Sequence, residues 1–408
     1  MKSIYKIFLA LIVIGSISCK KKKEIILDSP ISNNELNIIW KYPFPDSLIA
    51  YHGLYPILFE NSIIASYQPI INTDDENEII ISLNKENGEV QWTWNDYIRP
   101  SPQQVKGPYK NYTNNEKLFA CSNQDNYSIN MISGETNWAT NKEEGNPRTS
   151  LWNDLLFHTE TFGEAPYGDS SNLLMRNITS GIWQKVFTVV KTDQFEVNLE
   201  TPGAYLHSNG DTLLIFQNRQ VEIAPPYPER VDLYCYNLSQ DSITWFKSNL
   251  TPSGSSHVQT PLVEGDFVYF GGKWDFYCID IVSGEIIWTH NFYWDYQLSN
   301  FLIYNDLIIT NLDNGDLIAI DKFSGEQVWV NVGLSYCCTE LRIYNNRIYI
   351  GNTSLYIVDA DTGELLFKFK SPYYKSGIEF NNSIAVDLIN NKMYTSDYKF
   401  LYCFELPE

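Results

Sequence analysis

The sequence predicts an all-β fold, and more specifically an eight-bladed β-propeller. Three observations support this prediction: the composition, a repeated strand–turn–strand unit, and two chain ends that complete each other. Aromatic residues make up 15% of the 408 residues, with 28 Tyr and 11 Trp against only four Met. Because aromatic residues favour strands, this composition favours sheets over helices. Closed all-β folds of this length often form a single unit.

A short unit recurs along the chain. It consists of Asp or Asn, then Gly four residues later, then a large aromatic residue after four more. Self-similarity in one frame is the signature of a repeat architecture. Five copies carry the whole pattern: Asn84/Gly88/Trp92, Asn130/Gly134/Trp138, Asp280/Gly284/Trp288, Asp321/Gly325/Trp329 and Asp359/Gly363/Phe367. Two degenerate copies fit the same frame: Asn177/Gly181/Lys185 and Asn237/Asp241/Trp245.

Each unit reads as a hairpin. Apolar residues such as Leu355–Val358 precede the Asp or Asn and form a strand. In the turn the Asx side chain accepts bonds from nearby backbone amides and Gly takes a positive φ, while the next strand carries the aromatic residue. A second hairpin stands upstream, as in Leu341–Ile350 with Asn345-Asn346 at its turn. Four strands per repeat indicate propeller blades.

The two ends of the chain supply the count of blades. Three predicted strands close the sequence, at Ile384–Val386, Lys392–Thr395 and Leu401–Glu405, with Glu405 where the Asp belongs. The missing fourth strand is at the other end, where Leu36–Lys41 contains Trp40 but has no preceding strands. One blade shared between the termini closes the ring and removes the sheet edges. Seven internal units and this composite blade give eight blades over residues 36–408.

The repeat resembles a known family. Asp321 to Trp329 and Asp359 to Gly363 match the tryptophan-docking repeat of quinoprotein alcohol dehydrogenases, which bind pyrroloquinoline quinone (PQQ). The same repeat occurs in non-enzymatic propellers, notably the BamB family of outer-membrane assembly lipoproteins. The resemblance implies the fold, since one propeller hosts many functions. It also implies that the repeat tryptophans, Trp92, Trp138, Trp245, Trp288 and Trp329, pack between blades.

The N-terminal residues predict a targeting segment. Lys2 and Lys6 precede the apolar run Ile7–Ile14, which is too short to span a bilayer but fits a signal peptide over residues 1–18. Gly15-Ser16-Ile17-Ser18-Cys19 resembles a bacterial lipobox, in which the Cys thiol is acylated and becomes the new N-terminus. Residues 19–35 would then be a lipidated tether that anchors the protein to the outer membrane. The alternative is a secreted protein with a free Cys19.

The charge argues against nucleic-acid partners. The formal net charge is −20, and 23 basic residues face 49 acidic ones once Lys2, Lys6 and Lys20–Lys23 are set aside. The negative electrostatic field of such a protein repels phosphate backbones and favours basic partners or cations. The simpler reading is that it keeps an exported protein soluble.

Four of the seven cysteines read as core residues. Cys235, Cys278 and Cys403 each stand two residues before the Asx or Glu position, in different blades, so they are too far apart to pair. Cys121 is expected to behave in the same way.

The doublet Cys337-Cys338 is different, because it lies between two blades. Quinoprotein alcohol dehydrogenases carry an adjacent Cys pair in a comparable connection, joined as a disulfide that stacks on the quinone. By that resemblance Cys337 and Cys338 are candidate cofactor-binding residues, with PQQ and calcium as the implied cofactors. The alternatives are a chance doublet or a structural disulfide with no cofactor.

The sequence contains few other motifs with a recognised catalytic or metal-binding role. The five His show no metal-ligand spacing, and no haem, phosphate-loop or nucleophile-elbow motif is present, so no catalytic or metal residue is assigned. Asp74-Asp75-Glu76 would contact a cation or form a solvated acidic loop.

Long connections gather on one predicted face, opposite the short Asx turns. They include Ser66–Glu78, Asn95–Asn114, Glu160–Asn172, Gln217–Arg230 and Ser248–Thr260, with Phe292–Tyr296 and Cys337-Cys338 on the same side. Loop length, aromatic residues and acidity indicate a recognition face, unless the loops are only tolerated insertions. We therefore expect a non-catalytic binding or scaffold lipoprotein with envelope protein partners, possessing no cofactor and resembling BamB in outer-membrane protein assembly. The alternative is a PQQ-dependent oxidoreductase.

Overall fold

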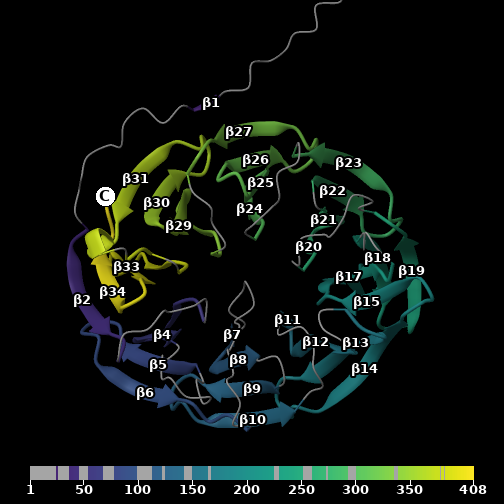
Figure 1. Cartoon of the computed structure of the whole chain (residues 1–408), viewed down its shortest axis with the longest axis horizontal. Helices are drawn as coiled ribbons and strands as arrows, with labels where there is room; N and C mark the ends of the chain where they lie inside the picture. The colour runs from purple at the N-terminus through teal and green to yellow at the C-terminus, as the bar shows by residue number, and fades with distance from the viewer. Residues whose placement is uncertain are drawn as a thin grey trace, which may run out of the picture.

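The predicted propeller is confirmed by a computed structural model of the chain. It describes residues 24–25, 36–45, 54–67, 78–98, 113–121, 125–141, 149–163, 167–224, 229–250, 260–272, 274–292, 300–334, 339–376, 378–380 and 382–408. Within these residues the strands form eight sheets, which stand radially in a closed ring around a central axis (Figure 1). The eight blades inferred from the repeat count are therefore present.

In blades 1 to 7 the antiparallel strands follow one another in sequence order from the centre of the ring to its rim (Figure 1). Blades 1 to 3 are β3 (Ile57–Phe59), β4 (Ser62–Tyr67), β5 (Ile79–Asn84), β6 (Val90–Trp94); β7 (Thr113–Asn114), β8 (Lys117–Cys121), β9 (Asp125–Asn130), β10 (Thr136–Asn141); and β11 (Thr149–Trp152), β12 (Leu155–Phe162), β13 (Ser170–Asn177), β14 (Trp183–Val190). Blade 4 splits its inner position between β15 (Phe195–Leu199) and β16 (Gly203–Leu206), followed by β17 (Thr212–Glu222), β18 (Glu229–Asn237) and β19 (Ser242–Lys247).

Blades 5 to 7 each contain four antiparallel strands, and in blade 6 a short fifth strand is added at the outer edge. They are β20 (Leu262–Glu264), β21 (Phe267–Gly271), β22 (Asp275–Asp280), β23 (Ile286–Asn291); β24 (Leu302–Tyr304), β25 (Leu307–Asn311), β26 (Leu317–Asp321), β27 (Gln327–Asn331); and β28 (Arg342–Tyr344), β29 (Arg347–Gly351), β30 (Ser354–Asp359), β31 (Leu365–Lys370). A single turn of 3-10 helix, η1 (Tyr374–Ser376), leads to blade 8.

Blade 8 joins the two ends of the chain, as predicted. Its order is β2 (Ile38–Pro43), β34 (Phe400–Glu405), β33 (Lys392–Ser396) and β32 (Ala385–Asp387), so the N-terminal strand forms its outer edge. Trp40 lies opposite Cys403, and Asn37 donates a 2.8 Å bond to the Glu405 carboxylate. The Trp40 ring is only partly buried, because an outer strand faces solvent on one side.

The Asx turns have the predicted geometry. In blade 6, for example, the Asp321 carboxylate accepts bonds from the amides of Phe323 (3.0 Å) and Ser324 (2.8 Å), and Gly325 has a φ of +73°. The hydrogen bond from the Ser324 amide, helped by those from the Ser324 hydroxyl and the Phe323 amide, lowers the pKa of Asp321, although partial burial opposes this effect. The Asx residue therefore terminates the third strand of the blade and starts the turn in one step.

The tryptophans dock between blades, as the resemblance implies. Each indole lies over the turn glycine of the next blade and donates its Nε1 hydrogen to the backbone oxygen just after the Asx residue. Such close packing needs a glycine, because a Cβ on Gly325 would lie 2.6 Å from Cε3 of Trp288. The six docked indoles are Trp40 on Gly88, Trp92 on Gly134, Trp138 on Gly181, Trp245 on Gly284, Trp288 on Gly325 and Trp329 on Gly363, with indole-to-carbonyl distances of 2.8–3.2 Å.

Residues 24–25 lie within the predicted tether. They form the short strand β1 (Glu24–Ile25), which pairs in parallel with Val330 and Asn331 at the outer edge of β27. The predicted signal peptide and Cys19 lie outside the described residues. The described part of the chain contains no helix with the length and hydropathy of a membrane span.

Candidate partner-binding surface

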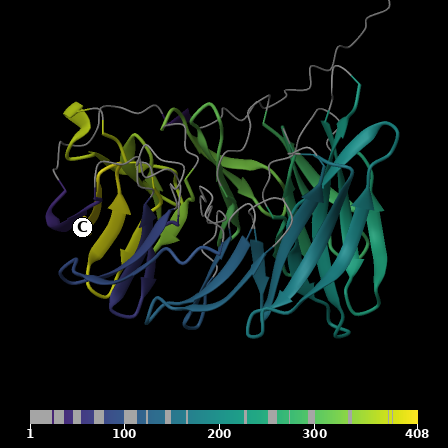
Figure 2. The ribbon, with the colours of Figure 1, turned by 60° about the horizontal axis from the view of Figure 1, so that its bottom comes forward.

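Blades 3 and 4 depart most from the repeat. Their strands reach 8 to 11 residues, where most strands of the other blades have five or six, and the pair stands higher than the rest of the ring (Figure 2). The β12–β13 and β17–β18 hairpins extend toward the side where long connections are predicted. Most of the described parts of Glu160–Asn172 and Gln217–Arg230 are therefore strand extensions, which corrects the prediction of loops there.

A partly buried polar network holds the two tall blades together. Arg219 on β17 contacts the Glu200 carboxylate at 3.3 Å and the Tyr167 hydroxyl at 2.9 Å, and Tyr167 donates to Glu229 at 2.5 Å. Burial alone would lower the pKa of Arg219, but the charges of Glu200 and Glu229 outweigh it and raise that pKa. A backbone bridge between Gly168 and Val197 adds a direct link. The upper ends of blades 3 and 4 are thus cross-linked by charge-assisted hydrogen bonds.

The tryptophan–glycine contact is missing where blade 3 meets blade 4. Lys185 stands in the tryptophan position, and Asp241, with a φ of +52°, stands in the glycine position. Phe187, two residues beyond the tryptophan position, lies at the interface instead, where its ring centroid is 5.2 Å from that of Phe216 and 5.4 Å from that of Tyr236. Phe187 therefore fills part of the junction, farther along the strand than an indole would lie.

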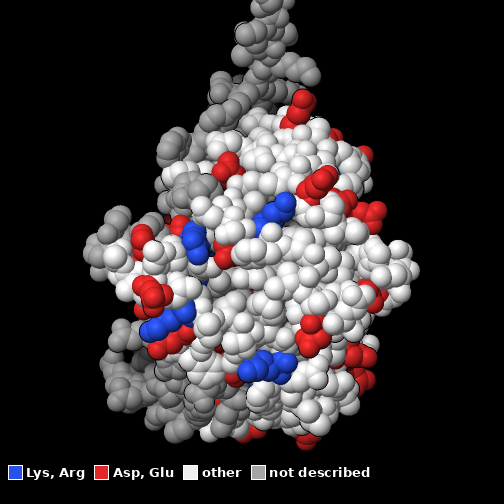
Figure 3. All heavy atoms as spheres, turned by 90° about the vertical axis from the view of Figure 1, so that its right-hand side faces the viewer, with Lys and Arg blue, Asp and Glu red and all other residues white. Residues whose placement is uncertain are grey.

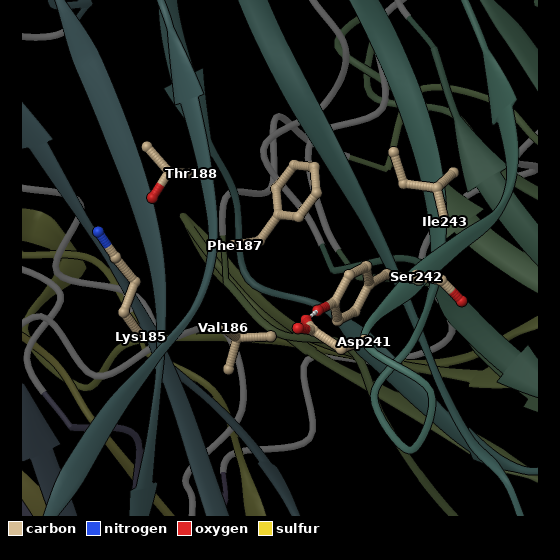
Figure 4. A pocket seen from close by; sticks show the side chains of 8 residues that line it. Lys185, Val186, Phe187, Thr188, Asp241, Ser242 and Ile243 are labelled. Atoms are coloured by element: carbon tan, nitrogen blue, oxygen red, sulfur yellow. Dashed lines mark hydrogen bonds between the residues drawn. The ribbon is translucent and has the colours of Figure 1, made fainter.

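A cavity remains beside Phe187 at the rim of the ring. Its volume is about 400 Å³, within the range of ligand pockets. Val186 and Phe187 lie between Lys185 on one side and Asp241 and Ile243 on the other (Figure 4). Tyr236 donates its hydroxyl hydrogen to the Asp241 carboxylate, and burial, followed by Asp241, raises the pKa of Tyr236 to about 12. The cavity therefore has an aromatic and aliphatic wall and a polar end.

Large apolar side chains are exposed on the rim around this cavity. The three consecutive outer strands β14, β19 and β23 each expose two of them, as does β2, whereas β31 exposes none. On this side of the molecule most of the described surface belongs to residues other than Lys, Arg, Asp and Glu (Figure 3). Exposed apolar side chains of this kind are typical of protein-binding sites. The six residues on β14, β19 and β23 are Trp183, Val190, Ile243, Phe246, Ile286 and Ile287.

The cysteines predicted to be core residues are buried. Cys121, Cys235, Cys278 and Cys403 lie on strands of blades 2, 4, 5 and 8. Burial raises the pKa of Cys235 and Cys278 to about 12, and that of Cys403 to about 11. They are therefore inert at neutral pH and pack as small apolar side chains.

The other predicted site residues lie outside the described residues. These are Cys19, Cys337, Cys338 and the acidic run Asp74–Glu76. Lipid attachment at Cys19 and quinone binding by Cys337 and Cys338 therefore stay predictions. In the part of the chain that the structure does describe, no three His, Cys, Asp or Glu side chains are placed to hold a metal ion.

The rim cavity was not predicted, although the sequence contained a sign of it. The two degenerate repeats, with Lys185 for the aromatic residue and Asp241 for glycine, meet at this one junction. Both residues of the docking pair are replaced at this junction, which indicates that the interface is packed differently from the others. Phe187 lies two residues beyond the tryptophan position, outside the nine-residue repeat, so the repeat does not reveal its compensating role.

Comparison with known proteins gives consistent results. Residues 229–368 match the family model described as "Outer membrane protein assembly factor BamB". A curated protein of that name from Kangiella koreensis is 24% identical over 184 residues, which cover 42% of this chain and 45% of the relative. The match thus spans less than half of that relative.

Solved structures share the fold. BamB from Moraxella catarrhalis superposes with a TM-score of 0.56 at 12% identity, covering 90% of this chain and all of that one. A europium-containing methanol dehydrogenase gives 0.61 at 9% identity, covering 93% and 96%. Identities this low show the architecture alone. Together, the matched repeats, the curated relative and the shared ring of blades support a PQQ-like, BamB-like β-propeller family for this chain.

Proposed function

We propose that this chain is a non-catalytic binding protein of the cell envelope that assists outer-membrane protein assembly, as its BamB relatives are named for doing. The observation that carries this proposal is the BamB family match over residues 229–368, which spans blades 5 and 6, the two outer strands of blade 4 and nearly all of blade 7. The rim of blades 4 and 5 exposes Ile243, Phe246, Ile286 and Ile287 within that segment, which suits a protein partner.

Membrane attachment through Cys19 forms part of the proposal. The lipobox-like sequence supports acylation of that residue, and acyl chains would hold the propeller at the outer membrane. Attachment would place the rim within reach of other envelope proteins, which are the proposed partners.

Deletion of the gene in its own host tests the assembly role. We expect the abundance of integral outer-membrane proteins to fall, and to recover when the wild-type gene is supplied. A Cys19→Ser variant separates the two parts of the proposal. It should leave the membrane fraction while keeping the thermal melt of the wild type, because the propeller begins after the tether. Unchanged outer-membrane protein levels after deletion would refute the assembly role.

The same purified protein tests the enzymatic alternative. A binding protein should show no saturable change in absorbance when it is titrated with pyrroloquinoline quinone and calcium. Saturable binding together with reduction of an artificial electron acceptor by an alcohol would overturn the non-catalytic assignment.

A further inference from the structure

The short strand β1 joins the predicted membrane tether to the ring. Glu24 and Ile25 pair in parallel with Val330 and Asn331, so β1 is the fifth strand of blade 6 and lies at its outer edge (Figure 1). Because the pair is parallel, β1 starts at the same end of the blade as β27, which is the end with the Asx turn of Asp321. The chain therefore enters the blade from its Asx-turn side.

The distance from Cys19 to β1 limits where a lipid anchor is able to lie. Cys19 precedes Glu24 by five residues, and a fully extended chain of that length spans at most about 18 Å. Adjacent strands lie about 4.8 Å apart, so a four-strand blade is about 14 Å deep. Blade 2 lies opposite blade 6, so two blades and the centre of the ring separate their rims (Figure 1). An acylated Cys19 is therefore confined to the side of the ring that blade 6 occupies.

The Asx-turn ends of blades 5 and 6 expose apolar side chains next to this anchor. Val282 in blade 5 and Phe323 in blade 6 each stand two residues after the Asx residue, and they are 48% and 56% exposed. In blades 1, 3, 4 and 7 the same position holds a polar or charged residue. Blade 2 has Ile132 there, at 54% exposure, but on the opposite side of the ring. Val282 and Phe323 are thus placed to enter the interface of a bilayer that holds the acyl chains.

The charges favour contact by this corner over contact by the whole Asx-turn face. Lys20–Lys23 are four consecutive cations between Cys19 and β1, and such a run is attracted to anionic headgroups. The Asx-turn face is acidic, because the inner turns of five blades expose a carboxylate on it, so anionic headgroups would repel it. The five residues are Glu60, Glu116, Asp154, Asp266 and Asp306.

We propose that β1 fixes the lipid anchor at blade 6, so that the ring meets the lipid surface of the outer membrane by the Asx-turn corner of blades 5 and 6. Val282 and Phe323 then contact the headgroup layer, and the face predicted to carry the long connections points away from the membrane. The inference rests on the acylation of Cys19 in the proposed function and adds the surface that touches the membrane. It does not depend on the assembly role.

Photocrosslinking to lipid tests this orientation. The full-length acylated protein, with p-benzoylphenylalanine in place of Phe323 or of Ile132, is reconstituted into vesicles of phosphatidylethanolamine and phosphatidylglycerol. The two positions are matched, because they hold the same place in the turn, are almost equally exposed and lie on opposite sides of the ring. Irradiation should attach lipid at position 323 at least roughly tenfold more often than at position 132. Equal yields at the two positions, or no lipid adduct at either, would overturn the proposal.

Proline in β1 tests the role of the strand. Replacing Glu24 and Ile25 by proline removes two backbone N–H groups, so the tether should lose its place on β27. The protein should stay in the membrane fraction, because Cys19 is unchanged, while the preference for lipid adducts at position 323 is lost. In the soluble Cys19→Ser protein, which needs no membrane, the same proline changes should make the backbone amides of β27 exchange hydrogen faster. Unchanged exchange, or an unchanged preference for position 323, would contradict the assignment.

Membrane fractionation separates this inference from the proposed function. If wild-type and Cys19→Ser proteins fractionate alike, the acylation of Cys19 and the inference fall together. If only the wild type is membrane-bound and positions 323 and 132 react equally, the inference fails while the anchor stands.

Discussion

Adding one methyl group at Gly325 tests the docking of tryptophan between blades. Gly325 has a φ of +73°, and a Cβ built there lies 2.6 Å from Cε3 and 2.7 Å from Cδ2 of Trp288. Gly325→Ala should therefore carry two costs. A left-handed backbone costs a non-glycine residue about 1–2 kcal/mol, and overpacking a filled interface costs about 1–3 kcal/mol more. The sum, roughly 2–5 kcal/mol, is a large part of a typical folding stability of about 5–15 kcal/mol.

The matched control for this prediction is Gly265→Ala. Gly265 also has a positive φ, +57°, but a Cβ there meets no atom within 4 Å. It should lose only the backbone contribution, about 1–2 kcal/mol. Equilibrium denaturation of both variants measures the difference, which isolates the contact with Trp288.

A double-mutant cycle completes the argument. In a Trp288→Ala background the clash is absent, so Gly325→Ala should cost no more than Gly265→Ala. Equal destabilisation by the two alanine variants in the wild-type background would show that the glycine is needed only for its backbone angle. Additive effects of Gly325→Ala and Trp288→Ala would lead to the same conclusion.

Three further predictions concern closure, acid stability and the buried thiols. Deleting Leu36–Pro43 removes β2, its ladder with β34 and the Trp40 indole, so the protein should aggregate or become sensitive to protease; a wild-type melt would refute the shared blade. Backbone bonds hold the pKa of Asp321 below its ordinary value of 3.8, so its stabilising effect is complete above that pH and is lost as the pH falls through the lower, folded-state value. Asp321→Asn should keep the turn, as Asn84 does in blade 1. It should also reduce the loss in free energy of unfolding as the pH is lowered, and an unchanged loss would contradict this. A thiol reagent at pH 8 should label Cys121, Cys235, Cys278 and Cys403 only after denaturation, because they are buried; rapid labelling of the native protein at these positions would show that they are exposed.

Much of the fold was predictable because the repeat encodes local and inter-blade chemistry in the same nine residues. Asp321, Gly325 and Trp329 specify a turn, a positive φ and a docking ring, and all three behave as their spacing predicts. The complementary ends also predicted the closing strand, although β2 begins and ends two residues later than expected. Regular repeats are predictable since each unit packs against another unit of the same kind.

The candidate site was less predictable, for a physical reason. Phe187 fills part of the junction from two positions beyond the missing indole, outside the nine-residue repeat, so the repeat pattern gives no sign of its role. The Arg219 network joins residues far apart in the chain, whose pairing depends on the height of blades 3 and 4. The predicted loop face lies largely outside the described residues, so its role as a recognition face stays a prediction.

The central claim is that this propeller assists outer-membrane protein assembly by binding a partner at its rim. Quantitative proteomics of outer membranes tests it most directly, in a deletion strain supplied with the wild-type, Ile287→Asp or Val328→Asp gene at equal expression. Ile287 and Val328 are exposed at the same position of their repeats, and only Ile287 belongs to the proposed rim surface. We predict that outer-membrane protein levels fall on deletion and recover with the wild-type and Val328→Asp genes, but not with Ile287→Asp. Levels that are unchanged by deletion, or that Ile287→Asp restores in full, would contradict the claim.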